Sequence, residues 1–122
     1  FLQDKEGLEI DMENVLDEDW RLLRDVYEQV EHPDFGLCFD IGHAHCYSDI
    51  PAIEWAEELA PYVRHVHIHD NAGERDSHLG LGRGNLPWKE ALSYLPRTET
   101  RTWTIECMNI EDVQICIQSL LT

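Results

Sequence analysis

Histidine and carboxylate side chains gather at a few points of the sequence, close to the ends of short apolar stretches. Six of the seven histidines lie between His43 and His78. Neutral imidazole is the commonest metal ligand in proteins, and carboxylates complete such sites. The side chains that stand at or just after a predicted strand end are Glu13, Asp40, His43, His67, Asp76, His78 and Glu106. Their types and placement indicate chemistry that depends on a bound metal ion.

The elements that must position these side chains are strand-like runs that alternate with helix-like runs. Strands are predicted over residues 8–15, 36–41, 63–69 and 102–107. Helices are predicted over residues 20–30, 51–59, 87–95 and 111–121, with Asp17 as the cap of the first. The pattern is a βα unit repeated four times, with about 30 residues in each unit.

Strands that alternate with helices imply an α/β fold with a parallel sheet. A complete TIM barrel needs eight parallel strands and about 250 residues. The 122 residues therefore suit a (β/α)4 half of a TIM barrel, and an open four-stranded α/β sandwich is the structural alternative.

Each predicted strand has one apolar and one polar face, because successive side chains point to opposite sides of a sheet. In the third strand, Val66 and Ile68 oppose His65, His67 and His69. The apolar faces are expected to pack on the helices, and the polar faces to line a barrel interior. Every strand then brings a potential ligand to the carboxyl end of the sheet, where (β/α)8 barrels carry their active sites.

Two further acids, Glu9 and Asp11, share the inward parity of Glu13. Buried acids without partners are costly, so the first strand would begin later, near Asp11, or the interior would be wet, or this region would not be barrel-like. His65 lies deeper in its strand and is expected to be a hydrogen-bonded core histidine.

Five short motifs follow one another along the chain: Met12-Glu13-Asn14, Asp40-Ile41-Gly42-His43, His67-Ile68-His69-Asp70-Asn71, Asp76-Ser77-His78-Leu79-Gly80 and Ile105-Glu106. Their order resembles strands five to eight of the xylose-isomerase-like barrels. That superfamily holds sugar and sugar-phosphate isomerases and epimerases, and also the endonuclease IV group. The resemblance covers nearly the whole chain and implies that residues 1–122 form the C-terminal half of such a barrel domain.

The resemblance implies a first metal site, in which Glu13, Asp40, His67 and Glu106 bind one divalent cation. Three carboxylates and one imidazole suit Mn, Zn, Co or Mg, and the spacing does not choose among them. The motif favours His67 over His69 as the imidazole ligand.

A second metal site is the next expectation, because His43, Asp76 and His78 resemble the ligands of an additional zinc in the endonuclease IV group. The spacing of Asp76 and His78 would let both side chains reach one ion. Ordinary solvated loop residues are the alternative interpretation of these two positions.

The resemblance to sugar isomerases and epimerases implies proton transfer through an enediolate. Such an enzyme removes a proton from a carbon next to a carbonyl, which the metal polarises. Glu13 and Glu106 are predicted to remove and return the proton, because they come from strands that would flank the site. His43 is the third candidate catalytic residue, binding a substrate oxygen instead of a metal. Hydride transfer is the alternative isomerase mechanism.

Composition bears on partners and location. The formal net charge of -16 argues against nucleic acid and anionic membranes as partners. No apolar run is long enough to span a bilayer. The four cysteines form no Cys-x-x-Cys pair and are expected to be reduced thiols of a cytoplasmic protein, mostly buried. The expected partner is a small sugar or sugar phosphate.

Two other functions compete with the isomerase or epimerase hypothesis. One is a metal phosphoesterase like the endonuclease IV group, which the Asp76-Ser77-His78 loop favours and the net charge of -16 opposes. The other is a half-barrel that binds metal without turning over substrate. A half-barrel exposes two sheet edges, which invite pairing with another chain and predict a homodimer.

Overall fold

The computed structural model describes residues 7–96 and 100–122. One parallel sheet, in the order β1-β2-β3-β4, is formed by β1 (Ile10–Glu13), β2 (Phe35–Asp40), β3 (Val63–Ile68) and β4 (Thr102–Ile105). The helices are α1 (Trp20–Val30), α2 (Ile41–Tyr47), α3 (Ala52–Leu59), the 3-10 helix η2 (Ala60–Tyr62), α4 (Trp88–Ser93) and α5 (Ile110–Leu121). The predicted α/β class with a parallel (β/α)4 arrangement is confirmed.

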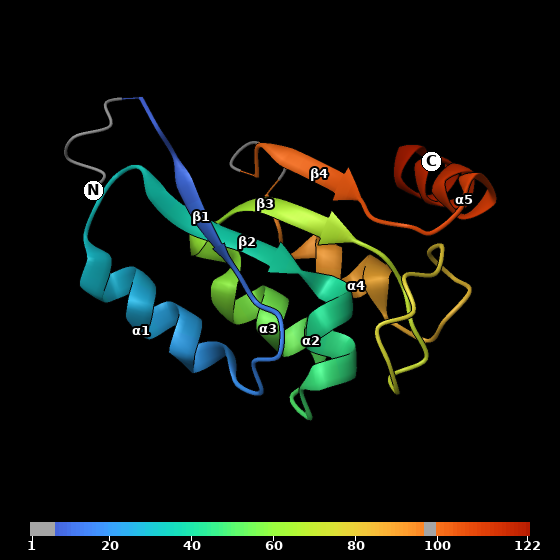
Figure 1. The fold of residues 1–122 in the computed structure, drawn as a ribbon, viewed down its shortest axis with the longest axis horizontal. Helices are drawn as coiled ribbons and strands as arrows, with labels where there is room; N and C mark the ends of the chain where they lie inside the picture. The colour runs from blue at the N-terminus through green and yellow to red at the C-terminus, as the bar shows by residue number, and fades with distance from the viewer. Residues whose placement is uncertain (1–6, 97–99) are drawn as a thin grey trace.

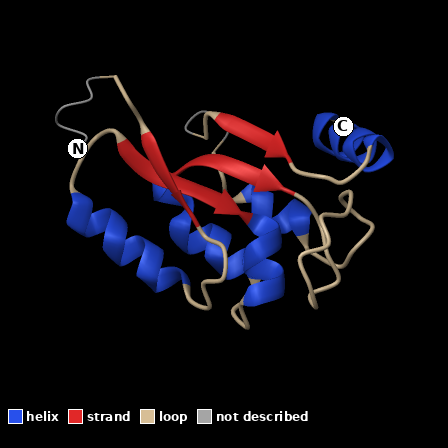
Figure 2. Cartoon of the chain, viewed as in Figure 1, coloured by secondary structure: helices blue, strands red, loops and turns tan. Residues whose placement is uncertain are grey.

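The hydrophobic core lies between the sheet and the helices on one of its sides. Figure 1 shows α1, α3 and α4 along that side, and Figure 2 shows the opposite side of the central strands open. Phe39, Val66 and Ile68 point from the strands into this core and are fully buried. Trp55 of α3 stacks on Phe39, with ring centroids 6.4 Å apart. The other face carries the polar side chains, as predicted from the alternation along each strand, and it is therefore available for chemistry.

The structure corrects several element boundaries. β2, β3 and β4 end earlier than predicted, at Asp40, Ile68 and Ile105, and α4 spans only Trp88–Ser93. β1 is shorter than the predicted strand over residues 8–15, because its pairing with β2 runs only from Ile10 to Glu13. Asp17 does not cap α1, as the sequence had suggested. Its carboxylate accepts from Val15 N at 2.9 Å, and Asp19 caps the helix by accepting from Arg21 N.

Helix α2 was missed by the sequence analysis, which assigned Ile41 to a strand. A β-branched residue followed by glycine has low helix propensity. The Asp40 carboxylate overrides this preference, because it caps the helix by accepting from His43 N at 2.8 Å. The chain therefore turns from β2 into a helix without an intervening loop, and this turn carries His43 back over the strand ends.

The four cysteines are free thiols in shielded surroundings: Cys38, Cys46, Cys107 and Cys116. Burial raises the pKa of Cys46 to about 11 and that of Cys107 to about 12. Thiols with such pKa values carry little thiolate at neutral pH, which supports a structural role. No helix of the described residues combines the length and the apolar character that crossing a membrane requires.

Candidate metal centres

The first candidate centre joins the carboxyl ends of all four strands. Glu13 ends β1, Asp40 ends β2, His67 lies near the end of β3, and Glu106 directly follows β4. One ligand atom from each of these side chains lies within 4.8 Å of the others. Parallel strands end at the same edge of a sheet, so residues up to 93 positions apart in sequence (13 to 106) meet here. The structure thus brings together the four side chains predicted for the first metal site.

His67 stands among the three carboxylates of this centre. Its Nδ1 atom lies 2.7 Å from Glu13 Oε2, 3.3 Å from Glu106 Oε1 and 3.7 Å from Asp40 Oδ2. The contact with Asp40, followed by that with the Cys38 thiol, raises the pKa of His67 to about 11. The protonated imidazole is therefore the counter-charge of the acids when no cation is bound. A divalent cation would take over that role.

Asp40 is fully buried, and its two carboxylate oxygens have different surroundings. Oδ1 accepts from His43 N and lies 2.7 Å from His69 Nε2. Oδ2 is buried without a hydrogen-bond partner and faces His67. Burial raises the pKa of Asp40, but the contacts with His67 and His69 outweigh it and hold the pKa well below its usual range. A buried, ionised and unpartnered oxygen fits a metal ligand, because leaving it unmatched would be costly.

Asn14 supports this centre and was not singled out from the sequence. It is 1% exposed, and its amide donates to Asp40 O at 3.0 Å while its Oδ1 accepts from Asp40 N at 2.8 Å. These two bonds tie the end of β1 to the end of β2 and thereby fix Glu13 beside Asp40. The only signal in the sequence was an amide directly after a strand end, which ordinary turns share.

The second candidate centre lies beside the first and is formed by His43, His69, Asp76 and His78. One ligand atom of each lies within 4.8 Å of the others. Asp76 Oδ2 is 3.1 Å from His43 Nε2, and Asp76 Oδ1 is 3.1 Å from His78 Nε2. Asp76 and His78 therefore turn inward from their loop, which favours the metal interpretation over that of solvated residues. His69, which the sequence analysis set below His67 as a ligand, belongs to this second cluster.

The loop that carries Asp76 and His78 is held down by the fully buried Asp70. Its backbone N–H and C=O both pair with Leu79, at 2.7 and 2.8 Å. Its carboxylate accepts from Gly82 N at 2.8 Å and from Leu86 N at 3.0 Å. Burial lowers the pKa of His78, but the Glu106 carbonyl and then Asp76 outweigh it and raise the pKa above its ordinary value.

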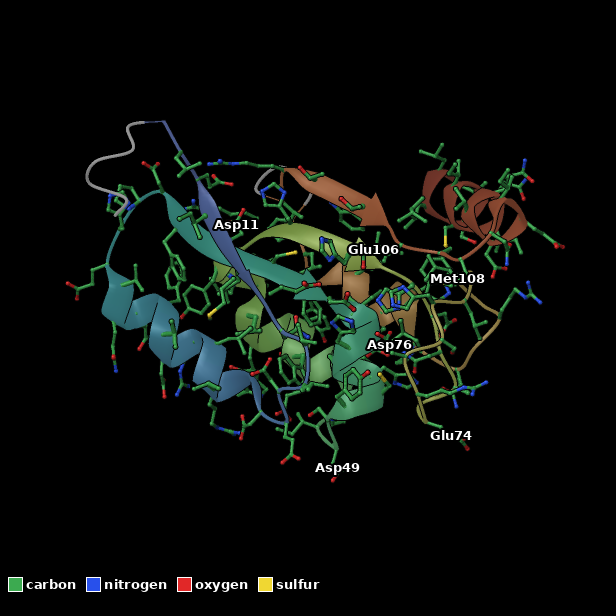
Figure 3. The ribbon with its side chains drawn as sticks, viewed as in Figure 1. Asp11, Asp49, Glu74, Asp76, Glu106 and Met108 are labelled. Carbon is green, nitrogen blue, oxygen red and sulfur yellow. The ribbon has the colours of Figure 1, made fainter. Side chains whose placement is uncertain are left out.

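A third polar cluster lies at the amino end of the sheet. Unlike the two candidate centres, it includes arginine side chains. Figure 3 shows Asp11 at that end, and Asp76 and Glu106 together at the other. His65 Nε2 lies 2.8 Å from Asp11 Oδ2 and 3.0 Å from Glu9 Oε2. Glu9 also pairs with Arg64 at 3.2 Å and with Arg101. His65 is thus hydrogen-bonded, as predicted, but it is half-buried among charged partners and does not lie in the core, because two acids share its face.

Cavities large enough for a small molecule lie away from these clusters. A groove of about 410 Å³ runs between β4 and α5 and is lined mainly by apolar side chains. Its lining residues are Thr100, Arg101, Trp103, Ile105, Ile117, Leu120 and Leu121. The apolar groove therefore lies along the free edge of β4 and does not include the residues of the candidate centres.

Comparison with known proteins gives a family and several relatives. The xylose isomerase-like TIM barrel family matches residues 2–114. An uncharacterized protein of Methanocaldococcus jannaschii is 26% identical over 122 residues, which are 98% of this chain and 47% of that protein. The crystal structure of a D-tagatose 3-epimerase-like protein has a TM-score of 0.83 at 28% identity, covering 98% of this chain and 48% of that one.

A protein from Thermus thermophilus, solved after soaking with ZnCl2, is also similar. It has a TM-score of 0.77 at 30% identity, and the match covers 94% of this chain and 44% of that one. The chain thus spans about half the length of the relatives it matches.

Proposed function

The chain belongs to the xylose isomerase-like TIM barrel family, and from that premise we propose that it carries the metal centre of a sugar or sugar-phosphate isomerase or epimerase. The observation that carries the proposal is the meeting of Glu13, Asp40, His67 and Glu106 within 4.8 Å at four successive strand ends. The similarity to a D-tagatose 3-epimerase-like protein supports a sugar as the substrate class.

The position of the chain in a barrel is part of this proposal. Residues 1–122 would supply strands five to eight, as the C-terminal half of a complete (β/α)8 barrel. The share of the relatives that is matched supports this, and so does the apolar groove along the free edge of β4. Another half-barrel, from the same polypeptide or a second copy of this chain, would then cover the open edges.

The proposed chemistry assigns a separate task to each side chain. Glu13, Asp40, His67 and Glu106 would hold a divalent cation, whether Mn, Zn, Co or Mg, which would supply Lewis-acid polarisation of a substrate carbonyl. Glu13 and Glu106 reach the centre from β1 and from the end of β4, with oxygens 2.7 and 3.3 Å from the same His67 nitrogen. One of these carboxylates removes the proton beside the carbonyl, and the other returns it.

His43 and its neighbours form the outer part of the proposed site. His43, Asp76 and His78 are proposed ligands of a second metal ion, and His43 is alternatively a donor to a substrate oxygen. The donor set of two imidazoles and a carboxylate is the type that zinc prefers.

The first test measures metal content of the purified chain by elemental analysis. The wild type is expected to hold a divalent ion, and Glu106→Ala is expected to lose much of it. Glu58→Ala, which removes an exposed acid of α3, is the matched control and is expected to bind as the wild type does. A wild type that takes up no ion even after loading, or a Glu106→Ala variant that binds normally, contradicts the proposal.

The second test follows proton exchange at carbon. The metal-loaded chain is incubated with ketoses and ketose phosphates in deuterated water, and deuterium next to the carbonyl is detected by NMR. Deuterium incorporation that Glu13→Gln abolishes supports proton transfer through an enediolate. Isomerisation without any deuterium uptake favours hydride transfer. Metal binding without either reaction supports a half-barrel that needs another half for turnover.

A metal phosphoesterase is the competing function, because the second cluster adds metal-ligating side chains that proton transfer does not require. The net charge of -16 opposes nucleic acid as its substrate. Duplex DNA with an abasic site and a simple phosphomonoester separate the two functions. Metal-dependent cleavage of either substrate, together with no exchange at carbon in sugars, would favour the phosphoesterase.

A further inference from the structure

We infer that the two open edges of this chain dock onto each other, so that a second copy of the chain completes an eight-stranded barrel. The apolar groove between β4 and α5 would receive β1 of the second copy, and α1 of that copy would pack beside α5. The inference rests on the barrel position given in the proposed function and names the partner that encloses the candidate centres.

The sheet ends in two strands of equal length and similar pattern. Within the described part of the chain, β1 pairs only with β2, and β4 pairs only with β3. Each of the two edge strands has four residues. Ile10 and Met12 share one side of β1, as Trp103 and Ile105 do in β4, and all four side chains are half-buried. Open edges of this kind invite pairing with another strand.

Helix α5 covers β4 only in part. Of its residues, Asp112 and Cys116 are buried, and Figure 1 shows the helix well apart from α1. The groove of about 410 Å³ lies between the helix and the strand, with Trp103 on one side and Ile117 and Leu121 on the other. Helix α5 therefore stands where it would cover β4 together with a following strand.

One flank of α1, at the opposite edge of the sheet, is also apolar and uncovered. Trp20 faces α3, where its indole N–H donates to Glu54 at 2.8 Å. Leu22, Val26 and Val30 follow at four-residue spacing and form a stripe on a different flank of the helix. Leu22 is 58% exposed and Val30 is 39% exposed. An apolar stripe in contact with water is typical of a surface that packs on a partner.

The exposed side chains of α5 form the counterpart of this stripe. Ile110, Ile117 and Leu121 recur at helical spacing and are 76%, 43% and 82% exposed. Helices α1 and α5 each follow a strand of the parallel sheet, so both begin at its carboxyl end. Docked side by side, they would run in the same direction. Val30 and Leu121, each near the end of its helix, would then lie at the same level.

The docking closes after two copies. The groove and the apolar stripe lie at opposite edges of one chain, so each copy offers one and receives the other, in a head-to-tail contact that a two-fold rotation closes. Two copies supply eight parallel strands, the number at which a TIM barrel closes. Glu13 and Glu106, whose side chains are 31% and 33% exposed, would then be enclosed by the second copy.

The net charge sets the conditions under which two copies can meet. Each copy carries a formal charge of -16, so repulsion opposes docking. Salt screens this repulsion, and the burial of apolar side chains is not weakened by screening. The dimer is therefore expected to become tighter as the salt concentration rises.

The test is sedimentation equilibrium of the chain at low and high salt. At high salt the wild type is expected at twice the mass of the 14.2 kDa chain. Val30→Glu and Leu121→Lys are each expected to raise the dissociation constant of the dimer by about 30-fold or more, because each places a charge in an apolar contact. Both positions are exposed, so circular dichroism should show an unchanged fold.

Ser93→Glu is the matched control, because it adds a charge at an exposed position of α4, away from both edges. It is expected to associate as the wild type does. An equal loss of association in this variant, or none in Val30→Glu and Leu121→Lys, overturns the inference.

Mixing the two edge variants tests the head-to-tail arrangement. In a dimer of Val30→Glu with Leu121→Lys, one contact joins the two opposite charges and the other contact is unchanged. An equimolar mixture should therefore recover association that neither variant shows alone. A mixture that does not recover indicates that like edges meet, and assemblies larger than two copies indicate that the ring does not close. Either result overturns the inference.

The remaining outcomes separate the inference from the proposed function. A wild type that stays monomeric at its highest soluble concentration overturns the inference and leaves the edges to another half-barrel. Association that weakens as salt rises overturns the apolar docking surface in favour of ion pairs. A closed dimer that binds no divalent ion keeps the inference and contradicts the proposed metal centre, whereas a monomer that loses bound ion only in Glu106→Ala does the reverse.

Discussion

The polar face of the sheet ends in two groups of acids and histidines that are neutralised in different ways. At the amino end, Glu9 and Asp11 contact His65, and Arg64 and Arg101 add two permanent positive charges. At the carboxyl end, the acids are Glu13, Asp40, Asp76 and Glu106. Within residues 7–96 and 100–122, these four carboxylates pair with histidines and with no lysine or arginine.

The difference indicates which acids have permanent counter-charges. Arginine stays charged at any ordinary pH, so Glu9 at the amino end is neutralised by the chain itself. Histidine can give up its proton and offer a lone pair, so the carboxyl-end clusters can exchange protons for metal ions. Similar residue types at two ends of one surface thus serve a structural network at one end and a proposed metal centre at the other.

The largest expected effect comes from Asp40→Asn, which removes charge from a residue of the first centre that also contacts His43 and His69 of the second. Divalent-ion affinity is expected to fall by more than about 100-fold, since losing a ligand costs more than the 10- to 100-fold typical of a supporting partner. Equilibrium dialysis with zinc and manganese measures this. Asp11→Asn at the amino end is the control, and an equal loss of affinity in that variant would erase the contrast between the two ends.

Asn14→Ala is expected to have the next largest effect, because it removes both hydrogen bonds between the buried Asn14 amide and the backbone of Asp40. The free energy of unfolding should fall by about 2–3 kcal/mol, and ion affinity by about 10- to 100-fold. Urea unfolding of the metal-free chain and calorimetric titration measure the two quantities. Unchanged affinity alongside lowered stability would show that Asn14 supports the fold alone.

The affinity of the carboxyl-end site for metal ions should depend on pH. The pKa of His67 is raised to about 11, so metal binding must displace a proton, and affinity should rise about tenfold per pH unit below that value. For the metal-free chain, the contribution of His67 to stability is full below about pH 6.5 and is lost as pH rises through about 11. Titrations in buffers of different ionisation enthalpy count the released proton. An affinity that stays constant between mildly acidic and alkaline pH contradicts this expectation.

The smallest expected effect comes from Arg101→Gln at the amino end. Its ion pair with Glu9 is largely exposed, so the free energy of unfolding should fall by about 1 kcal/mol or less. Metal stoichiometry should stay the same, as elemental analysis would show. Loss of bound ion in this variant would mean that the two ends are electrostatically coupled.

Much of the carboxyl-end site could be predicted, because strand parity and the order of motifs depend on local sequence. Glu13, Asp40, His67 and Glu106 each lie at or next to the end of a strand, and parallel strands bring such ends together. The contacts at the amino end were harder to predict from the sequence, since Arg101 is 92 positions from its partner Glu9. The local pattern placed Glu9 and Asp11 away from the strand end, but it did not show that arginines would neutralise Glu9.

Local sequence was sufficient for the alternation of strands and helices, the apolar and polar faces, and the residue types available for metal binding. The partition of histidines between two clusters required the folded chain. His67 and His69 share one parity, yet the strand ends after Ile68, and the chain beyond it sends His69 toward Asp40 and Asp76. Parity follows from backbone geometry within a strand, whereas contacts beyond its end depend on distant elements, such as the space that Gly42 leaves in α2.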